Sequence, residues 1–254
     1  MPPRIFGTGD AHPWQSYPVS RRKKVGRMVT RFAALALVAA LSSAPAWADV
    51  EGSVSLTSDY IDKGLSQSDG NAAFQGGLTW THETGLFLAM DGSTVDFNDS
   101  TDAELNLIGG YQWQWEQWAV VAGISRTHYA GAPKGAGMDL WEFALAGSLD
   151  LETHQWEAEM VYSPDDGGAG DALYHRIAVT IPFAERFAVS PHLGHQWYDR
   201  KDLGGPNFWE WGAELSYALA PATIGIAYTD TSLKNEPGCK CGGRVAAFVT
   251  VSFP

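Results

Sequence analysis

Most residues of this chain that could do chemistry are carboxylates alternating with apolar side chains. Glu104 stands between two apolar residues, and Glu142 stands between Trp141 and Phe143. Successive side chains of a β-strand point to opposite faces, so such carboxylates would gather on one face of a sheet. The carboxylates placed in this way are Glu51, Asp59, Asp91, Glu104, Glu142, Glu157, Glu159, Glu210 and Glu214.

Only two basic residues, Arg176 and Arg244, share this face with the acidic residues. If the face lines a passage, its carboxylates would attract cations and disfavour anions. Arg176 lies across the 163–171 connection from Glu157 and Glu159, so we predict one cross-strand ion pair there. A second interpretation is that the acids pair locally or solvate a plugged interior.

Ser190 and His192 are the residues to weigh for nucleophilic catalysis, which needs a serine with a histidine base within reach. They lie two residues apart on one strand face. On the lipid-facing wall of a membrane barrel, such a pair would suit a lipid hydrolase. No serine motif and no third orienting residue accompanies the pair, so hydrolysis is an alternative and not the leading interpretation.

The two cysteines, Cys239 and Cys241, lie in one glycine-flanked cluster. In an oxidising compartment they predict a tight local disulfide. A metal site would need further Cys or His ligands nearby, and the sequence offers none there. The acidic segment 165–171 lacks the ligand spacing of a calcium loop and is expected to be a flexible loop. We therefore predict no metal and no cofactor.

Twelve segments with apolar residues at a spacing of two must position these side chains. Most have 10–12 residues, which suits membrane-spanning β-strands of about 9–11 residues better than soluble strands of about 5–6. The sequence thus predicts an all-β, transmembrane, antiparallel up-and-down β-barrel of about 12 strands. The segments are 50–61, 72–82, 86–96, 103–113, 118–129, 139–149, 155–162, 172–182, 187–198, 208–219, 222–231 and 244–253.

The connections alternate between short turns and longer polar loops, as in bacterial outer-membrane barrels. The longer ones, predicted to face outside the cell, are 62–71, 97–102, 130–138, 163–171, 199–207 and 232–243. Many of the 11 Trp and 9 Tyr residues lie near strand ends, where aromatic girdles meet the membrane interfaces. The alternative is a secreted β-sandwich with an aromatic core, which would need shorter strands and no alternation of loop lengths.

The first 48 residues have the pattern of a secretory signal peptide, starting at Met1 or at Met28. Basic residues precede an apolar run at 32–41, and the segment ends at Ala46-Trp47-Ala48. This leader carries seven of the 17 basic and one of the 29 acidic residues, so residues 49–254, the predicted barrel, have a net charge of −18. Such an acidic chain is not expected to bind nucleic acid.

Several short motifs stand out in the predicted barrel, at Ser55–Tyr60, Gly64–Gln67, Asp69-Gly70, Gln75–Gly77, Glu104–Tyr111 and Asp230-Thr231. These motifs resemble the TorF family of outer-membrane porins, in which a Ser-Asp-Tyr strand leads to a Gly-Ile/Leu-Ser-Gln loop and a Gln-Gly-Gly strand. The chain departs from the family at Ile61-Asp62-Lys63, where an aromatic–Arg pair often precedes the glycine. The resemblance implies an outer-membrane barrel and supplies no catalytic motif.

These observations lead to one functional hypothesis and two alternatives. We expect a porin-like, cation-preferring channel for small solutes in the outer membrane of a Gram-negative bacterium, surrounded by lipid and without enzymatic activity. The alternatives are an outer-membrane lipid hydrolase and a plugged structural or adhesive barrel. The sequence leaves the transported solute and the oligomeric state open.

Overall fold

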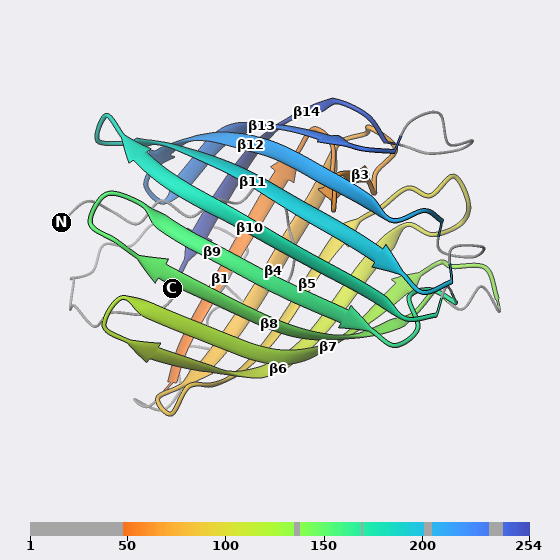
Figure 1. Cartoon of the computed structure of the whole chain (residues 1–254), viewed down its shortest axis with the longest axis horizontal. Coiled ribbons are helices and arrows are strands. Elements are labelled where there is room, and N and C mark those ends of the chain that lie inside the picture. Colours follow the sequence, from red (N-terminus) through yellow and green to blue (C-terminus); the bar gives the residue numbers. More distant parts are fainter. Residues whose placement is uncertain (1–47, 135–137, 169, 201–204, 234–240) are drawn as a thin grey trace, which may run out of the picture.

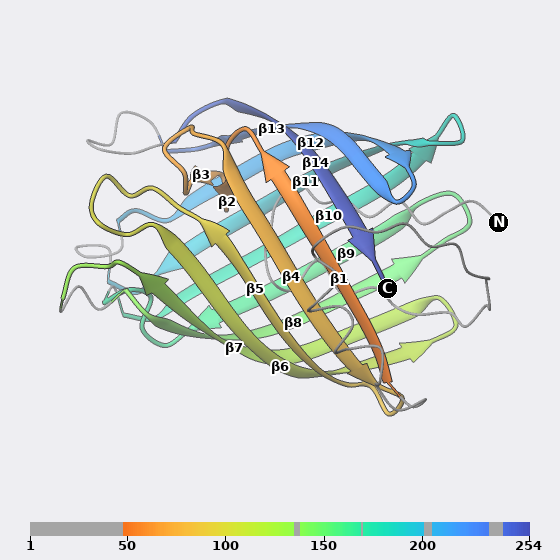
Figure 2. The same cartoon turned by 180° about the vertical axis from the view of Figure 1, so that it is seen from behind.

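Twelve antiparallel strands form a closed barrel (Figures 1 and 2). The computed structural model describes residues 48–134, 138–168, 170–200, 205–233 and 241–254. Each barrel strand pairs with its neighbours in the sequence, and β14 pairs with β1 to close the sheet. The predicted fold is therefore confirmed. The barrel strands are β1 (Ala48–Thr57), β4 (Ala73–His82), β5 (Leu86–Thr94), β6 (Ala103–Trp115), β7 (Trp118–Ala130), β8 (Leu140–Asp150), β9 (Gln155–Ser163), β10 (Ala172–Phe183), β11 (Phe187–Tyr198), β12 (Phe208–Leu219), β13 (Ala222–Thr231) and β14 (Arg244–Phe253).

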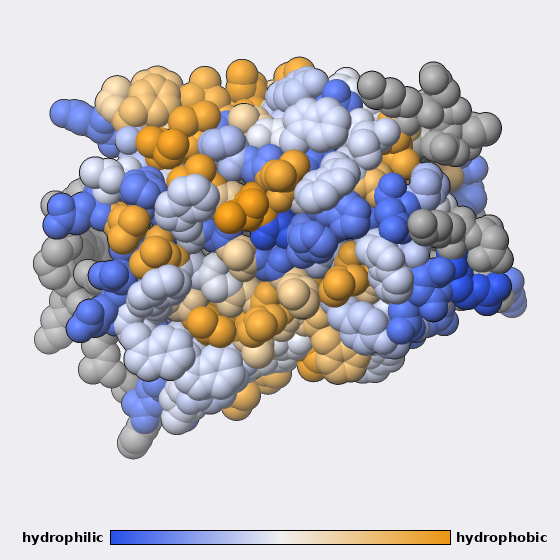
Figure 3. Space-filling model, in the orientation of Figure 1, coloured by the Kyte–Doolittle hydropathy of each residue, from blue (hydrophilic) through white to orange (hydrophobic). Residues whose placement is uncertain are grey.

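The two faces of the barrel wall follow the alternation in the sequence. Leu107 and Leu145 are each 53% exposed and point outward, whereas the side chain of Glu142 points inward and the residue is 6% exposed. Apolar residues are spread over the outer surface formed by β8–β12, and hydrophilic residues lie at both ends of the barrel and in a smaller patch near the middle of this view (Figure 3). The outer face thus has the apolar belt that a lipid bilayer requires.

The first barrel strand ends earlier than the sequence suggests. The segment predicted as a strand over 50–61 leaves the barrel wall after Thr57, whose Oγ1 donates a hydrogen bond to the Asp59 carbonyl at 2.8 Å. The chain then forms a small separate hairpin from β2 (Ile61–Asp62) and β3 (Leu65–Ser66) before it joins β4. Asp59 therefore lies on a loop and not on a barrel strand.

Part of the barrel interior is apolar. Phe87, Ile108, Ala144, Val161 and Tyr174 form a buried cluster contributed by five different strands. The interior of the wall is therefore a mixture of packed apolar residues and charged residues. Among the described residues, no helix is both long and apolar enough to cross a membrane.

Candidate functional site

Residues 58–72, which we call the inward hairpin, fold into the barrel. Tyr60, Ile61, Ser66 and Ser68 are all buried, and Ile61 is only 3% exposed. Within 59–72, exposed positions occur only from Asp69 onward. The expectation that 62–71 forms an external loop is therefore wrong for 62–68, whereas 69–71 are exposed. The burial of Ile61 supplies the physical reason, because an apolar side chain gains free energy when it leaves water.

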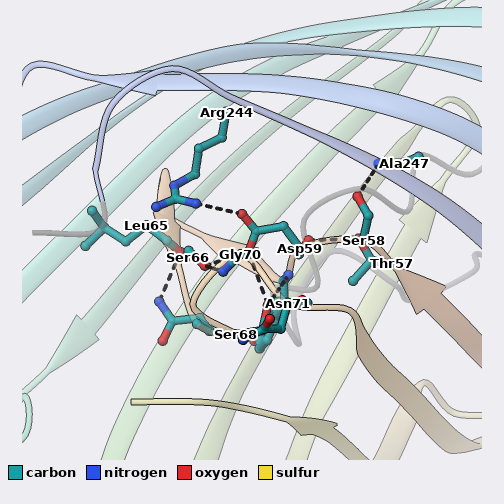
Figure 4. Close-up of polar contacts among 12 residues, drawn as sticks. Thr57, Ser58, Asp59, Leu65, Ser66, Ser68, Gly70, Asn71, Arg244 and Ala247 are labelled. Atoms are coloured by element: carbon teal, nitrogen blue, oxygen red, sulfur yellow. Dashed lines mark hydrogen bonds and ion pairs between the residues drawn. The ribbon is translucent and has the colours of Figure 1, made fainter. Parts of the chain in front are cut away.

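Asp59 ties the inward hairpin together and to the barrel wall (Figure 4). Its Oδ1 accepts hydrogen bonds from Ser66 Oγ at 2.5 Å and from Ser68 Oγ at 3.1 Å. Its Oδ2 forms an ion pair with Arg244 Nη1 at 2.9 Å, at the first residue of β14. Tyr60 N also donates to Ser68 Oγ at 2.9 Å. One carboxylate thus fixes both the shape of the hairpin and its position.

The tip of the inward hairpin is a two-residue turn at Lys63 and Gly64. Their φ angles are 48° and 77°, and two successive positive values are the requirement of a type I′ turn. A Cβ at Gly64 would lie 2.5 Å from Thr231 Cγ2 and 3.0 Å from Glu210 Cβ, so glycine lets the tip approach β12 and β13 closely. The tip therefore reaches strands that are not direct neighbours of β1 or β4, the two strands that the hairpin connects.

Lys63 connects the tip to two further strands. Its Nζ lies 3.4 Å from Glu142 Oε1 on β8 and 5.4 Å from the ring centroid of Tyr174 on β10. Burial alone would lower the pKa of Lys63, but the carboxylates of Glu142, Asp62 and Asp166 outweigh burial and raise the pKa well above its usual value. Lys63 is therefore a charged ammonium group inside the barrel.

A hydrogen-bonded group of three side chains lies beside this tip. Tyr174 Oη donates to Glu210 Oε1 at 2.8 Å, and His192 Nε2 lies 2.9 Å from Glu210 Oε2. Glu210 is only 2% exposed, so its two oxygens are held by partners instead of water. Lys63 and His192 thus contact carboxylates that the sequence analysis proposed for this face, at Glu142 and Glu210.

A second polar network lies between β5, β6 and β7. Asn106 Nδ2 donates to Asp91 Oδ1 at 3.0 Å and to Glu104 Oε1 at 2.7 Å, while Asn106 Oδ1 accepts from Thr127 Oγ1 at 2.6 Å. Tyr60 Oη extends this network to the inward hairpin through Glu104 Oε1 at 3.5 Å. The hairpin thus contacts acidic side chains on both sides of the barrel.

The inward face carries the acidic residues proposed from the sequence, with Asp59 reaching it from the hairpin. Arg176 stands directly opposite Glu159 in the β9–β10 ladder, in the register expected for their ion pair. Reasoning from the sequence missed Lys63 and Tyr174, and it weighed His192 only as a partner of Ser190. All the residues proposed from the sequence as lumen-lining are buried or half-buried: Asp59, Asp91, Glu104, Glu142, Glu157, Glu159, Arg176, Glu210 and Glu214.

The remaining chemical hypotheses fare differently. Ser190 Oγ bonds to Thr180 Oγ1 at 2.9 Å, while His192 pairs with Glu210, so Ser190 and His192 form no lipid-facing catalytic pair. The described residues contain no group of three or more His, Cys, Asp or Glu that could hold a metal ion. Cys241 is disulfide-bonded, and Cys239 lies outside the described residues, as do residues 1–47 of the predicted signal peptide.

The fold and the apolar outer face together define the class of membrane protein to which this chain belongs. A closed twelve-stranded barrel with an apolar exterior is an outer-membrane β-barrel protein. The sequence matches a family model over residues 41–252, and the chain belongs to that family, described as bacterial protein of unknown function (Gcw_chp). No curated protein matches the sequence.

Solved structures share the fold at low sequence identity. The KdgM porin superposes with a TM-score of 0.55 and 8% identity, covering 81% of this chain and 99% of that chain. The same values hold for the KdgM porin in complex with disordered oligogalacturonate. The NanC porin gives a TM-score of 0.52 and 14% identity, covering 81% of this chain and 100% of that chain. These likenesses establish the barrel architecture.

Proposed function

We propose that this protein is a channel for passive diffusion of small solutes, with the inward hairpin as its constriction. The observation that carries the proposal is the position of the hairpin, whose tip lies against Glu142, Tyr174 and Glu210 on the far wall. A loop that narrows a barrel sets which solutes can pass. The resemblance to TorF porins and the fold shared with KdgM and NanC support the same function.

The proposed channel prefers cations. The alternation rule assigns nine carboxylates to the inward side, and they are accompanied by three basic side chains, Lys63, Arg176 and Arg244, and by the imidazole of His192. Local ion pairs therefore leave a net negative lining. Such a lining raises the local concentration of cations and the barrier for anions. Outer-membrane lipid would surround the barrel, and residues 1–48 would be the signal peptide removed on export.

A plugged structural or adhesive barrel is the second candidate. The observations that favour it are the burial of the inward hairpin and the apolar cluster around Phe87 and Ile108 inside the wall. Both features reduce the space through which a solute could pass. The channel and the plugged barrel share one fold, so only transport measurements separate them.

Planar-bilayer recording of the refolded exported chain, residues 49–254, tests the proposal. We expect stepwise current increases as single channels insert. Absence of current in bilayers that contain verified folded protein would contradict the channel. Absence of both current and lipid hydrolysis would favour the plugged barrel. Absence of current together with hydrolysis of ester-linked lipid would favour the enzyme.

A further inference from the structure

The pocket around the Lys63 ammonium group has the chemistry of an ammonium-binding site. The carboxylate of Glu142 lies 3.4 Å from Lys63 Nζ, and the Tyr174 ring lies 5.4 Å from it. A carboxylate and an aromatic face together are a recurring means of holding ammonium groups, and desolvation strengthens the cation–π contact. The side chains of Lys63 and Glu142 are 16% and 8% exposed, so this contact is largely removed from water.

The barrel wall, and not the hairpin, builds this pocket. Tyr174 is held by its hydrogen bond to Glu210, whose other oxygen contacts His192. Gly194 makes room for this arrangement, because a Cβ there would overlap Glu210 Oε1 and lie 2.6 Å from Tyr174 Oη. Tyr174 is therefore held by contacts within β10, β11 and β12, and Glu142 projects from β8, so both should keep their positions when Lys63 leaves.

Lys63, in contrast, belongs to the turn of the inward hairpin and not to the barrel wall. It is the first residue of the two-residue turn between β2 and β3, and the hairpin is anchored elsewhere, at Asp59 and Arg244. A second ammonium group could replace that of Lys63 with no change in the charge of the pocket. Because the Coulomb attraction of Glu142 would be kept, such an exchange is favoured over leaving the carboxylate unpaired.

We propose that Glu142 and Tyr174 form the ammonium-recognition site of the channel, which Lys63 occupies when no solute is bound. The ligand class is small organic cations with primary ammonium groups, such as linear alkyl diamines. This inference rests on the proposed function for its role in transport. The binding itself requires only the folded barrel, so it can be tested separately.

Calorimetric titration of 1,4-diaminobutane into the folded barrel in neutral detergent at low salt tests the site. Lys63→Met removes the competing ammonium group and keeps a flexible side chain of similar length, so this variant should bind the diamine at least tenfold more tightly than the unaltered chain. The affinity gained should be lost in Lys63→Met with Glu142→Gln. The matched control is Lys63→Met with Asp150→Asn, which neutralises an exposed acid at the other end of β8 and should bind like Lys63→Met alone.

Two results would overturn the site. One is equal affinity of the unaltered chain and Lys63→Met, and the other is unchanged affinity after Glu142→Gln. If the Met variant fails to fold, as judged by circular dichroism, Lys63→Ala provides a second variant that lacks the competing ammonium group. If the barrel binds the diamine but never conducts, the proposed channel function is refuted and the proposed ammonium site stands. If the barrel conducts but does not bind the diamine, only the proposed ammonium site is refuted.

Discussion

Replacing Leu145 by Arg would place a charge at the centre of the lipid-facing wall. Leu145 is the sixth of eleven residues in β8 and is 53% exposed on the outer face. Five residues at ~3.3 Å rise and ~45° tilt separate it from either strand end by about 12 Å of membrane depth. That depth is the bilayer midplane of a barrel, where an Arg costs roughly 2–4 kcal/mol.

The expected loss corresponds to a decrease of roughly 30- to 1,000-fold in the equilibrium between folded and unfolded chain, since about 1.4 kcal/mol is tenfold. The assay is urea unfolding in lipid vesicles, followed by tryptophan fluorescence. The matched control is Ala146→Arg, one residue further along the strand. Ala146 points inward and pairs with Glu159 on β9, so a new Arg would face a carboxylate instead of lipid. Equal destabilisation by both substitutions would refute the assignment of the two faces.

Three further predictions concern the inward hairpin, the lining and the topology. Arg244→Ala removes the anchor at Asp59, so single-channel conductance should rise about twofold; unchanged conductance and current noise would contradict the constriction. Changing Glu104, Glu142, Glu157 and Glu159 together to Gln should bring the K⁺/Cl⁻ permeability ratio close to one, and an unaltered ratio would exclude these acids from the lining. In a chain without the native cysteines, a cysteine introduced at Asp165 should react with a membrane-impermeant external reagent, whereas one introduced at Glu185 should stay protected. The reverse labelling pattern would show that the barrel has the opposite orientation in the membrane.

The sequence predicted the barrel wall well because alternation and segment length are local properties. Leu145 and Glu142 could be assigned to opposite faces from their spacing alone, and the structure confirms both faces. This local rule covers the pairs formed by successive barrel strands, whereas closure of the barrel requires β14 to pair with β1. The same rule predicts that strand-borne acidic residues such as Glu104 and Glu210 face inward, and both residues are buried in the structure.

The inward hairpin could not be predicted from local sequence patterns, because its position depends on contacts between segments that are distant in the sequence. Asp59 reaches Arg244 across 185 residues, and Lys63 reaches Glu142 across 79 residues. A polar stretch such as 62–71 is read as an external loop when only its composition is considered. The signal that could have revealed it is the apolar pair Ile61 and Leu65 around Lys63-Gly64, which has the pattern of a minimal hairpin.

The reversal potential of the channel in a tenfold KCl gradient tests the central claim most directly, that the acidic lumen narrowed by the inward hairpin conducts cations. The account predicts a potential with the sign of the K⁺ equilibrium potential. Raising both solutions toward 1 M should weaken it, because the Debye length falls from ~10 Å at 0.1 M to ~3 Å at 1 M. A potential with the sign of the Cl⁻ equilibrium potential would contradict the account.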